Sequence, residues 1–298
     1  MKMNIYKFII VLLCLITVMF SFSGVDNVEH IDRKVSNKKN NINKEGEELI
    51  CSVESSDLHT ATNLIERFTV PYGYQRISYK EGSFGDYVRL YPIFPYGSKL
   101  LMYDGCPSNR QWMAAAVFQL PLEPYDLQQC ADSIMRWYAE YYFSQQKYES
   151  IKYHFVDGSL HSWVDSKNYD GTYDSLIKFL NEVFNHANTV SLECESEAVT
   201  VDELQIGDIL IRGGYPGHAL MVVDVAINDK GKKAILLGQG LMPAQQFHVV
   251  NNPLHENDPW YYQDELSETF STPGYTFSLT NFKRPIFCGC SLSETIKW

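Results

Sequence analysis

Residues 204–239 read LQIGDILIRGGYPGHALMVVDVAINDKGKKAILLGQ, and this stretch decides the fold. Aliphatic runs at 209–211, 218–226 and 233–239 are separated by a glycine-rich loop and by a turn at 228–231. Turn residues between short apolar runs are typical of antiparallel hairpins. The stretch therefore predicts three consecutive antiparallel strands.

The clearest helix of the sequence comes before these strands. Asp126 and Gln129 have the spacing of a capping box, which marks a helix start. Apolar or small residues then recur at helical spacing, namely Leu127, Cys130, Ala131, Ile134, Tyr138, Tyr141 and Tyr142. A second helix is expected over 175–186. Between 68 and 105, short aromatic and β-branched runs broken by Pro and Gly predict a β-rich N-terminal extension. The fold class is thus α+β.

The N-terminus has the pattern of an export signal. Lys2 and Lys7 lead into an apolar run, and small residues near Ser23 suit cleavage there. Residues 1–23 are therefore interpreted as a signal peptide, 24–50 as a flexible polar linker, and 51–298 as a single domain. We expect the protein to be secreted or held in the cell envelope, with membrane contact only through an uncleaved N-terminal segment.

Charge and composition exclude several classes of function. The formal net charge is -11, which argues against non-specific nucleic-acid binding because that needs clustered Lys and Arg. His154, Asp157 and His161 fit no standard zinc spacing, and a solvated loop is the favoured interpretation. We expect neither a metal ion nor a cofactor.

Cys130 and His218 are the candidates for chemistry. Cys130 falls in the first turn of the capped helix, where free backbone N–H groups and the helix dipole can lower a thiol pKa. It also lies on the apolar stripe, so a buried core cysteine is the competing interpretation. His218 opens an apolar strand after a glycine-rich loop, where it is either a base or a hydrogen-bonded structural residue. If the hairpin turn centres near 229–230, Gln239 lies within roughly one cross-strand pair of His218 and can orient it.

The stretch from Gly207-Asp208-Ile209 through Gly217-His218-Ala219 resembles the NlpC-type and CHAP-type branches of the papain-like superfamily. Gln129-Cys130 at the head of a helix is similar to the CHAP pattern. The resemblance implies a papain-like core of a helix packed on an antiparallel sheet, with 144 to about 200 as a helical insertion. It also implies Cys130 as nucleophile, His218 as general base and Gln239 as orienter.

A closer resemblance covers most of the chain after the linker, which is identified as a member of a bacterial family called domain of unknown function 4846. The shared segments are 83–91, 103–105, 126–132, Arg136, 139–141, 216–219 through 224–226, and 242–245. This family brings no activity with it.

The leading hypothesis is an exported cysteine hydrolase of peptide-like amide bonds, with cell-wall peptide as substrate by analogy. The backbone N–H of Cys130 and the side chain of Gln128 or Gln129 are the oxyanion candidates. Gly217 and Gln245 are further cleft candidates. The alternatives are a non-catalytic cell-envelope binding protein on the same scaffold, and an acyl transferase or thioesterase.

Overall fold

The three strands expected from residues 204–239 form the middle of one large antiparallel sheet in the computed structural model, which describes residues 59–287. The sheet order is β2-β9-β8-β7-β6-β13-β5, with β1 added to β7 and β10 added to β8. Two separate hairpins, β3–β4 and β11–β12, complete the strands of the described chain. The expected signal peptide (1–23) and linker (24–50) lie outside the described residues.

The strands of the sheet are β1 (Tyr74–Arg76), β2 (Ala114–Val117), β5 (Ser196–Ala198), β6 (Ile209–Arg212), β7 (His218–Asn228), β8 (Lys233–Gln239), β9 (His248–Val250), β10 (Tyr261–Tyr262) and β13 (Phe282–Pro285). The hairpins are β3 (Lys152–His154) with β4 (Leu160–Ser162), and β11 (Thr269–Thr272) with β12 (Tyr275–Ser278). The α-helices are α3 (Leu64–Arg67), α4 (Phe84–Leu90), α5 (Cys130–Ser144), α6 (Tyr173–His186) and α7 (Thr189–Cys194). Single 3-10 turns lie at Gln111–Met113, Tyr148–Ser150, Val201–Glu203, Gln263–Glu265 and Leu279–Asn281.

The central hairpin has the predicted turn and register. Gly231 donates its backbone N–H to the carbonyl of Asn228 at 2.9 Å, and Met221 faces Gly238 across the pair. That register puts Leu220 opposite Gln239, as the turn position predicted. β7 is buried along most of its length because it has strands on both sides and helices packed against it. The α+β class, with a large antiparallel sheet, is confirmed.

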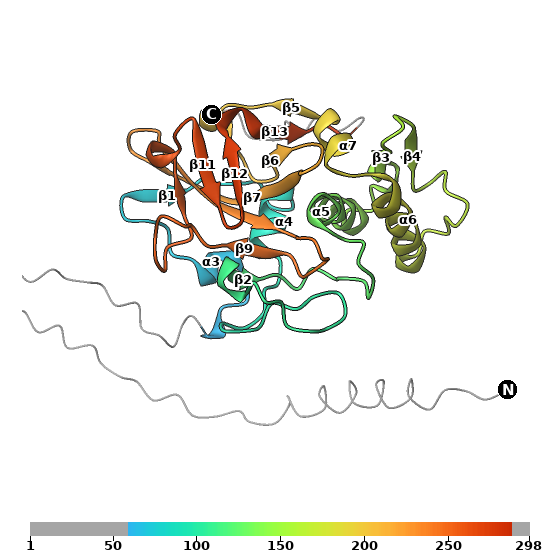
Figure 1. Cartoon of the computed structure of the whole chain (residues 1–298), viewed down its shortest axis with the longest axis horizontal. Coiled ribbons are helices and arrows are strands. Elements are labelled where there is room, and N and C mark those ends of the chain that lie inside the picture. Colours follow the sequence, from blue (N-terminus) through green and yellow to red (C-terminus); the bar gives the residue numbers. More distant parts are fainter. Residues whose placement is uncertain (1–58, 288–298) are drawn as a thin grey trace, which may run out of the picture. The chain divides into compact units, whose positions relative to one another are not determined.

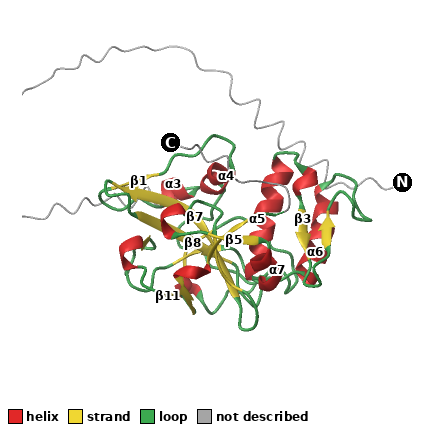
Figure 2. Ribbon diagram, turned by 90° about the horizontal axis from the view of Figure 1, so that it is seen from above, coloured by secondary structure: helices red, strands yellow, loops and turns green. Residues whose placement is uncertain are grey.

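Helix α5 packs against β7 and is buried on nearly every side (Figures 1 and 2). One flank meets α4 and the turn before β6, where Tyr138 stacks on Phe84 with ring centroids 4.3 Å apart and donates its hydroxyl to the Gly207 carbonyl. The opposite flank faces α6, where Arg136 pairs with Glu140 at 2.6 Å. A helix enclosed in this way has its first residue, Cys130, held in a fixed place relative to the start of β7.

The prediction of a β-rich N-terminal extension is wrong. In the described residues before β2, the α-helices α3 and α4 accompany a single three-residue strand, β1. The aromatic run was misleading because Ser83 caps α4 by accepting the backbone N–H of Asp86 at 3.4 Å. Phe84 and Val88 then lie one turn apart and both point into the core, as helical periodicity requires.

The segment between α5 and the central strands contains more than helices. The second predicted helix exists as α6, which begins two residues earlier than expected after its N-cap Thr172. The short helix α7 and the hairpin β3–β4 were not foreseen. Figure 1 shows α6 and this hairpin together on the side of α5 away from β7.

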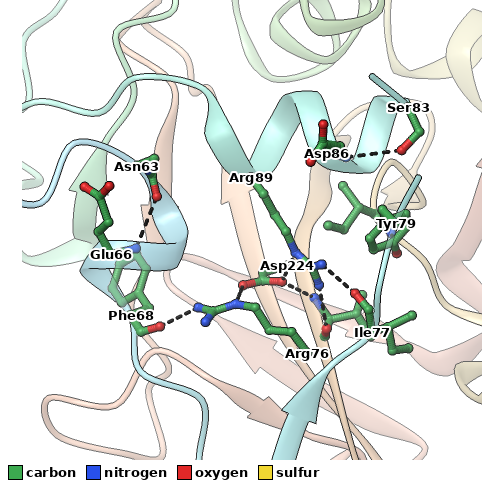
Figure 3. A network of polar contacts seen from close by, with 12 residues as sticks. Asn63, Glu66, Phe68, Arg76, Ile77, Tyr79, Ser83, Asp86, Arg89 and Asp224 are labelled. Atoms are coloured by element: carbon green, nitrogen blue, oxygen red, sulfur yellow. Dashed lines mark hydrogen bonds and ion pairs between the residues drawn. The ribbon is translucent and has the colours of Figure 1, made fainter. Parts of the chain in front are cut away.

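A buried carboxylate ties the N-terminal elements to the sheet (Figure 3). Asp224 on β7 is fully buried and accepts the Nε–H of Arg76 at 2.8 Å and that of Arg89 at 2.7 Å. The same arginines donate to backbone carbonyls, Arg76 to Phe68 and Arg89 to Val225. β1, α4 and β7 are therefore joined through one side chain.

None of the helices within residues 59–287 has the length and apolar character needed to cross a membrane.

Candidate active site

A cavity of about 730 Å³ opens where the N-terminus of α5 meets the start of β7. Both Cys130 and His218 line it, so the fold brings together the two residues singled out from the sequence. The other walls come from the loop before β7, the start of α7, the segment after β8 and the turn between β11 and β12. Their lining residues are Arg110, Met113, Gln129, Ala131, Asp132, Asn188, Thr189, Val190, Gly214, Tyr215, Pro216, Gly217, Leu241, Met242, Pro273, Gly274 and Tyr275.

Cys130 is the first residue of α5, and the helix start is capped differently from the prediction. The N-cap is Gln129, whose backbone N–H donates to Asp132 Oδ2 at 3.0 Å. Asp126, the expected cap, lies outside the helix because its carboxylate accepts the backbone N–H of Ala244 at 2.7 Å. Gly240 allows this close packing, since a Cβ there would lie 2.7 Å from the Gln129 carbonyl oxygen.

The thiol of Cys130 is held in its neutral form. Burial, with a further contribution from the Asp132 carboxyl, raises its pKa to about 11. The backbone N–H groups of Ala219, Ala131 and Cys130 itself act in the opposite direction but are outweighed. The expected lowering of this thiol pKa at the helix start is therefore wrong, because desolvation exceeds the effect of the free N–H groups.

His218 belongs to a chain of hydrogen bonds that fixes which ring nitrogen carries the proton. Its Nε2 lies 2.7 Å from Gln239 Oε1, and Gln239 Nε2 lies 3.3 Å from His248 Nε2. His248 Nδ1 lies 3.0 Å from the Gln246 carbonyl oxygen, which can only accept. His248 Nδ1 must therefore carry a hydrogen, which leaves His248 Nε2 as the acceptor of the Gln239 amide N–H. Gln239 Oε1 in turn accepts from His218, so His218 Nε2 carries a hydrogen. His218 Nδ1 is then left as an unprotonated base.

Both histidines are kept neutral by their surroundings. Burial lowers the pKa of His218, the bond to Gln239 partly offsets this, and the nearby Arg110 guanidinium lowers the pKa further. His248 is completely enclosed, and burial lowers its pKa to about 4. The rings of Tyr275 and Phe277, on the β11–β12 hairpin, lie 5.4 and 6.3 Å from the His218 ring, centroid to centroid. Neutral His218 is the form that can accept a proton.

The cleft candidates separate into two groups. Gln129 and Gly217 line the cavity, as expected. Gln128 and Gln245 are buried and lie outside its lining. Gln128 fails as an oxyanion donor because its Nε2 donates to the Pro121 carbonyl and its Oε1 accepts from Arg136 on the far side of α5. Gln239 is fully buried behind His218, as suits an orienting residue.

Three residues of the site were missed from the sequence. Arg110 lies in an irregular segment, and His248 lies on the three-residue strand β9, so neither carries a pattern. Asp132 lies two residues after Cys130 in the first turn of α5, and the capping-box spacing Gln129-x-x-Asp132 was a readable signal for it.

His154 and His161, for which the sequence favoured a solvated loop over a zinc site, have partners other than a metal ion. His154 Nδ1 contacts the carboxylate of Glu195, and His161 Nε2 lies 2.8 Å from Ser159 Oγ. Asp157 accepts from Ser159. In the part of the chain that the structure describes, no three His, Cys, Asp or Glu side chains gather as a metal site.

Asp132→Asn is expected to change how stability depends on pH. Burial raises the pKa of this carboxyl from 3.8 to about 7, so the folded chain holds its proton more tightly than the unfolded chain does. The stability that comes from this tighter proton binding is fully present below about pH 4 and is lost as the pH rises through 7. Relative to the unmodified protein, the Asn variant should gain roughly 2–4 kcal/mol in unfolding free energy between pH 4 and pH 8. Urea unfolding at several pH values measures this, and a pH-independent difference would contradict it.

The fold and the cavity define an α+β domain in which a cysteine at a helix start and a histidine at a strand start share one cavity. The family model for domain of unknown function 4846 matches residues 64–284, which is more than half of the 298 residues. The chain belongs to this family, and the family prediction from the sequence is confirmed. Neither a curated protein nor a solved structure matches the chain.

Proposed function

We propose that this chain is a cysteine hydrolase of peptide-like amide bonds, with Cys130 as nucleophile, His218 as general base and Gln239 as the residue that orients the base. We propose a papain-like arrangement of helix and sheet as the scaffold. Export to the cell envelope, and cell-wall peptide as substrate, are extensions of the proposal by analogy with related exported enzymes.

The observation that carries the proposal is the hydrogen-bond chain behind His218. A histidine whose Nε2 is committed to Gln239 at 2.7 Å presents its basic Nδ1 as the remaining nitrogen. Gln239 and His248 have no access to the cavity, so the chain orients His218 without competing for substrate.

The chemistry follows the usual two steps of covalent catalysis. His218 Nδ1 takes the thiol proton as Sγ attacks the carbonyl carbon, and the oxygen becomes an oxyanion held by backbone N–H groups at the start of α5. The tetrahedral carbon then expels the amine, which leaves with the proton from His218. Water, deprotonated by the same nitrogen, hydrolyses the thioester and returns the thiol.

The thiol pKa of about 11 decides how the proton moves. An ion pair formed before the substrate binds would need a thiol that ionises more readily than the imidazole. Here the buried thiol holds its proton and the buried imidazole has a lowered pKa, so the resting pair is neutral. Proton transfer during the attack is the mode that this pair supports, which is general-base catalysis.

The test is the rate at which iodoacetamide alkylates Cys130 as a function of pH. An unassisted thiol of pKa about 11 would react tenfold faster for each pH unit up to that value. With His218 as base, the rate should level off above an inflection below pH 6.5, the ordinary histidine pKa, and rise again only in strong alkali. His218→Ala should remove the low-pH inflection and lower the rate at pH 7 by at least roughly tenfold.

Labelling must be resolved by residue because Cys106 and Cys194 are exposed free thiols. Peptide mapping by mass spectrometry separates the sites, and Cys130→Ala identifies the signal of interest. Retention of the low-pH inflection in His218→Ala, or a rate that climbs steadily with pH in the unmodified protein, would refute the general-base role.

A non-catalytic binding protein is the second candidate, and the high thiol pKa favours it. Cys130 and His218 line one cavity, but no hydrogen bond joins the thiol and the ring in the described structure. A binding module predicts slow alkylation that ignores His218. Acyl transfer or thioester cleavage would use the same residues, and product analysis with added amine or thioester separates these from amide hydrolysis.

A further inference from the structure

We propose that the substrate carries a carboxylate near the bond that is cut, and that Arg110 binds this carboxylate. The inference deepens the proposed hydrolase function and rests on it. Arg110 is then a specificity-determining residue at the wall of the cavity next to His218.

Arg110 has no acidic partner in the part of the chain that the structure describes. Among the described residues, the one hydrogen bond of its side chain runs from Nη1 to the Met242 carbonyl at 3.1 Å. Within residues 59–287, none of the ion pairs includes it. A guanidinium has five N–H donors, so most of its hydrogen-bonding capacity is left for a ligand.

Arg110 is the one permanently charged side chain among the described residues that line the cavity. Cys130 holds a neutral thiol and His218 a neutral ring, for the reasons given above. Asp132 is buried, its Oδ2 accepts from the Gln129 N–H, and burial raises its pKa to about 7. Among the lining residues, Arg110 is the sole Arg or Lys. A guanidinium without an acidic partner at a cavity wall is a local feature in a protein of net charge -11, and it favours an anionic ligand at this place.

The position of Arg110 suits a carboxylate close to the reacting atoms. The guanidinium lies near enough to His218 to lower the pKa of that ring. Its planar fork matches a carboxylate with two parallel hydrogen bonds. The neighbouring walls are largely apolar, formed by Met113, Leu241 and Tyr275, so the rest of the substrate is expected to be apolar around that charge.

The test compares a negatively charged and a neutral alkylating agent, iodoacetate and iodoacetamide, at Cys130 of the full chain. The ratio of the two rates, divided by the ratio for N-acetylcysteine amide in solution, reports attraction of the carboxylate and cancels changes in thiol reactivity. We expect a normalised ratio of roughly 5–10, because a single charge in a partly exposed site gives effects of this order. Arg110→Met should bring the ratio to about 1, and Arg110→Lys should retain most of it. Added salt should reduce the ratio in the unmodified protein through screening.

The outcomes distinguish the two proposals. If Cys130 reacts with neither reagent near neutral pH, the hydrolase proposal fails and takes this inference with it. If iodoacetamide labels Cys130 with the His218-dependent profile but the normalised ratio stays near 1, the hydrolase proposal stands and the role of Arg110 is overturned. A raised ratio that survives Arg110→Met also overturns it, since another group would then attract the anion.

Discussion

Asp224→Ala is expected to lower the free energy of unfolding by about 3–5 kcal/mol, the cost of breaking a buried ion pair from one side. The variant removes the carboxylate that pairs with Arg76 of β1 and Arg89 of α4, so both guanidinium groups lose their counter-charge. Arg89 is almost completely enclosed, with 7% of its side chain exposed, so water cannot replace the lost carboxylate. The loss should fall on the contacts that hold β1 and α4 to β7.

Urea unfolding measures this change, and Asp264→Ala is the matched control. Asp264 pairs with Lys232 at 3.4 Å on the surface, where 66% of the Asp264 side chain is exposed. Exposed pairs of this kind contribute at most about 1 kcal/mol. If the two variants lose similar stability, Asp224 does not anchor the N-terminal elements. Should Asp224→Ala fail to fold at all, Asp224→Asn, which keeps the shape and one of the two acceptor oxygens, should recover a folded chain of intermediate stability.

Gln239→Leu is expected to slow the alkylation of Cys130 near neutral pH by about a hundredfold, within the range that a general base contributes. The substitution removes the acceptor of the His218 Nε2–H and the donor to His248 Nε2. His218 is then free to place its proton on Nδ1 and to rotate. In either case Nδ1 is no longer held as the basic nitrogen in one fixed orientation.

Gln119→Leu controls for the exchange of side chains, because Gln119 is exposed and its side chain, within residues 59–287, donates a single hydrogen bond, to the Ile93 carbonyl. Its effect on alkylation should be negligible. Gln239→Glu is a second test. A carboxylate beside Nε2 should raise the pKa of His218 and move the inflection of the rate profile to higher pH. An unchanged profile in both Gln239 variants would show that Gln239 merely fills space behind the ring.

The sequence predicted those elements whose signals are local. Gly231 and the apolar runs around it determine the β7–β8 hairpin, and the hairpin fixes by register alone that Gln239 comes near His218. The helical spacing after Cys130 determines α5. Local reasoning failed for α4, where an aromatic run concealed a Ser83 cap, and for the helix start, where Asp126 found a partner at Ala244.

What the sequence by itself determined is therefore the α+β class, the family, and the pairing of a helix-start cysteine with a strand-start histidine. Only the tertiary structure decided the state of that pair. The neutral thiol results from burial between α5 and β7, and the neutral ring from enclosure beside Gln239 and His248, which lie on adjacent strands. Arg110 enters the same cavity from a segment without regular pattern. Desolvation and long-range proximity are properties of the packed chain, and no local stretch of residues encodes them.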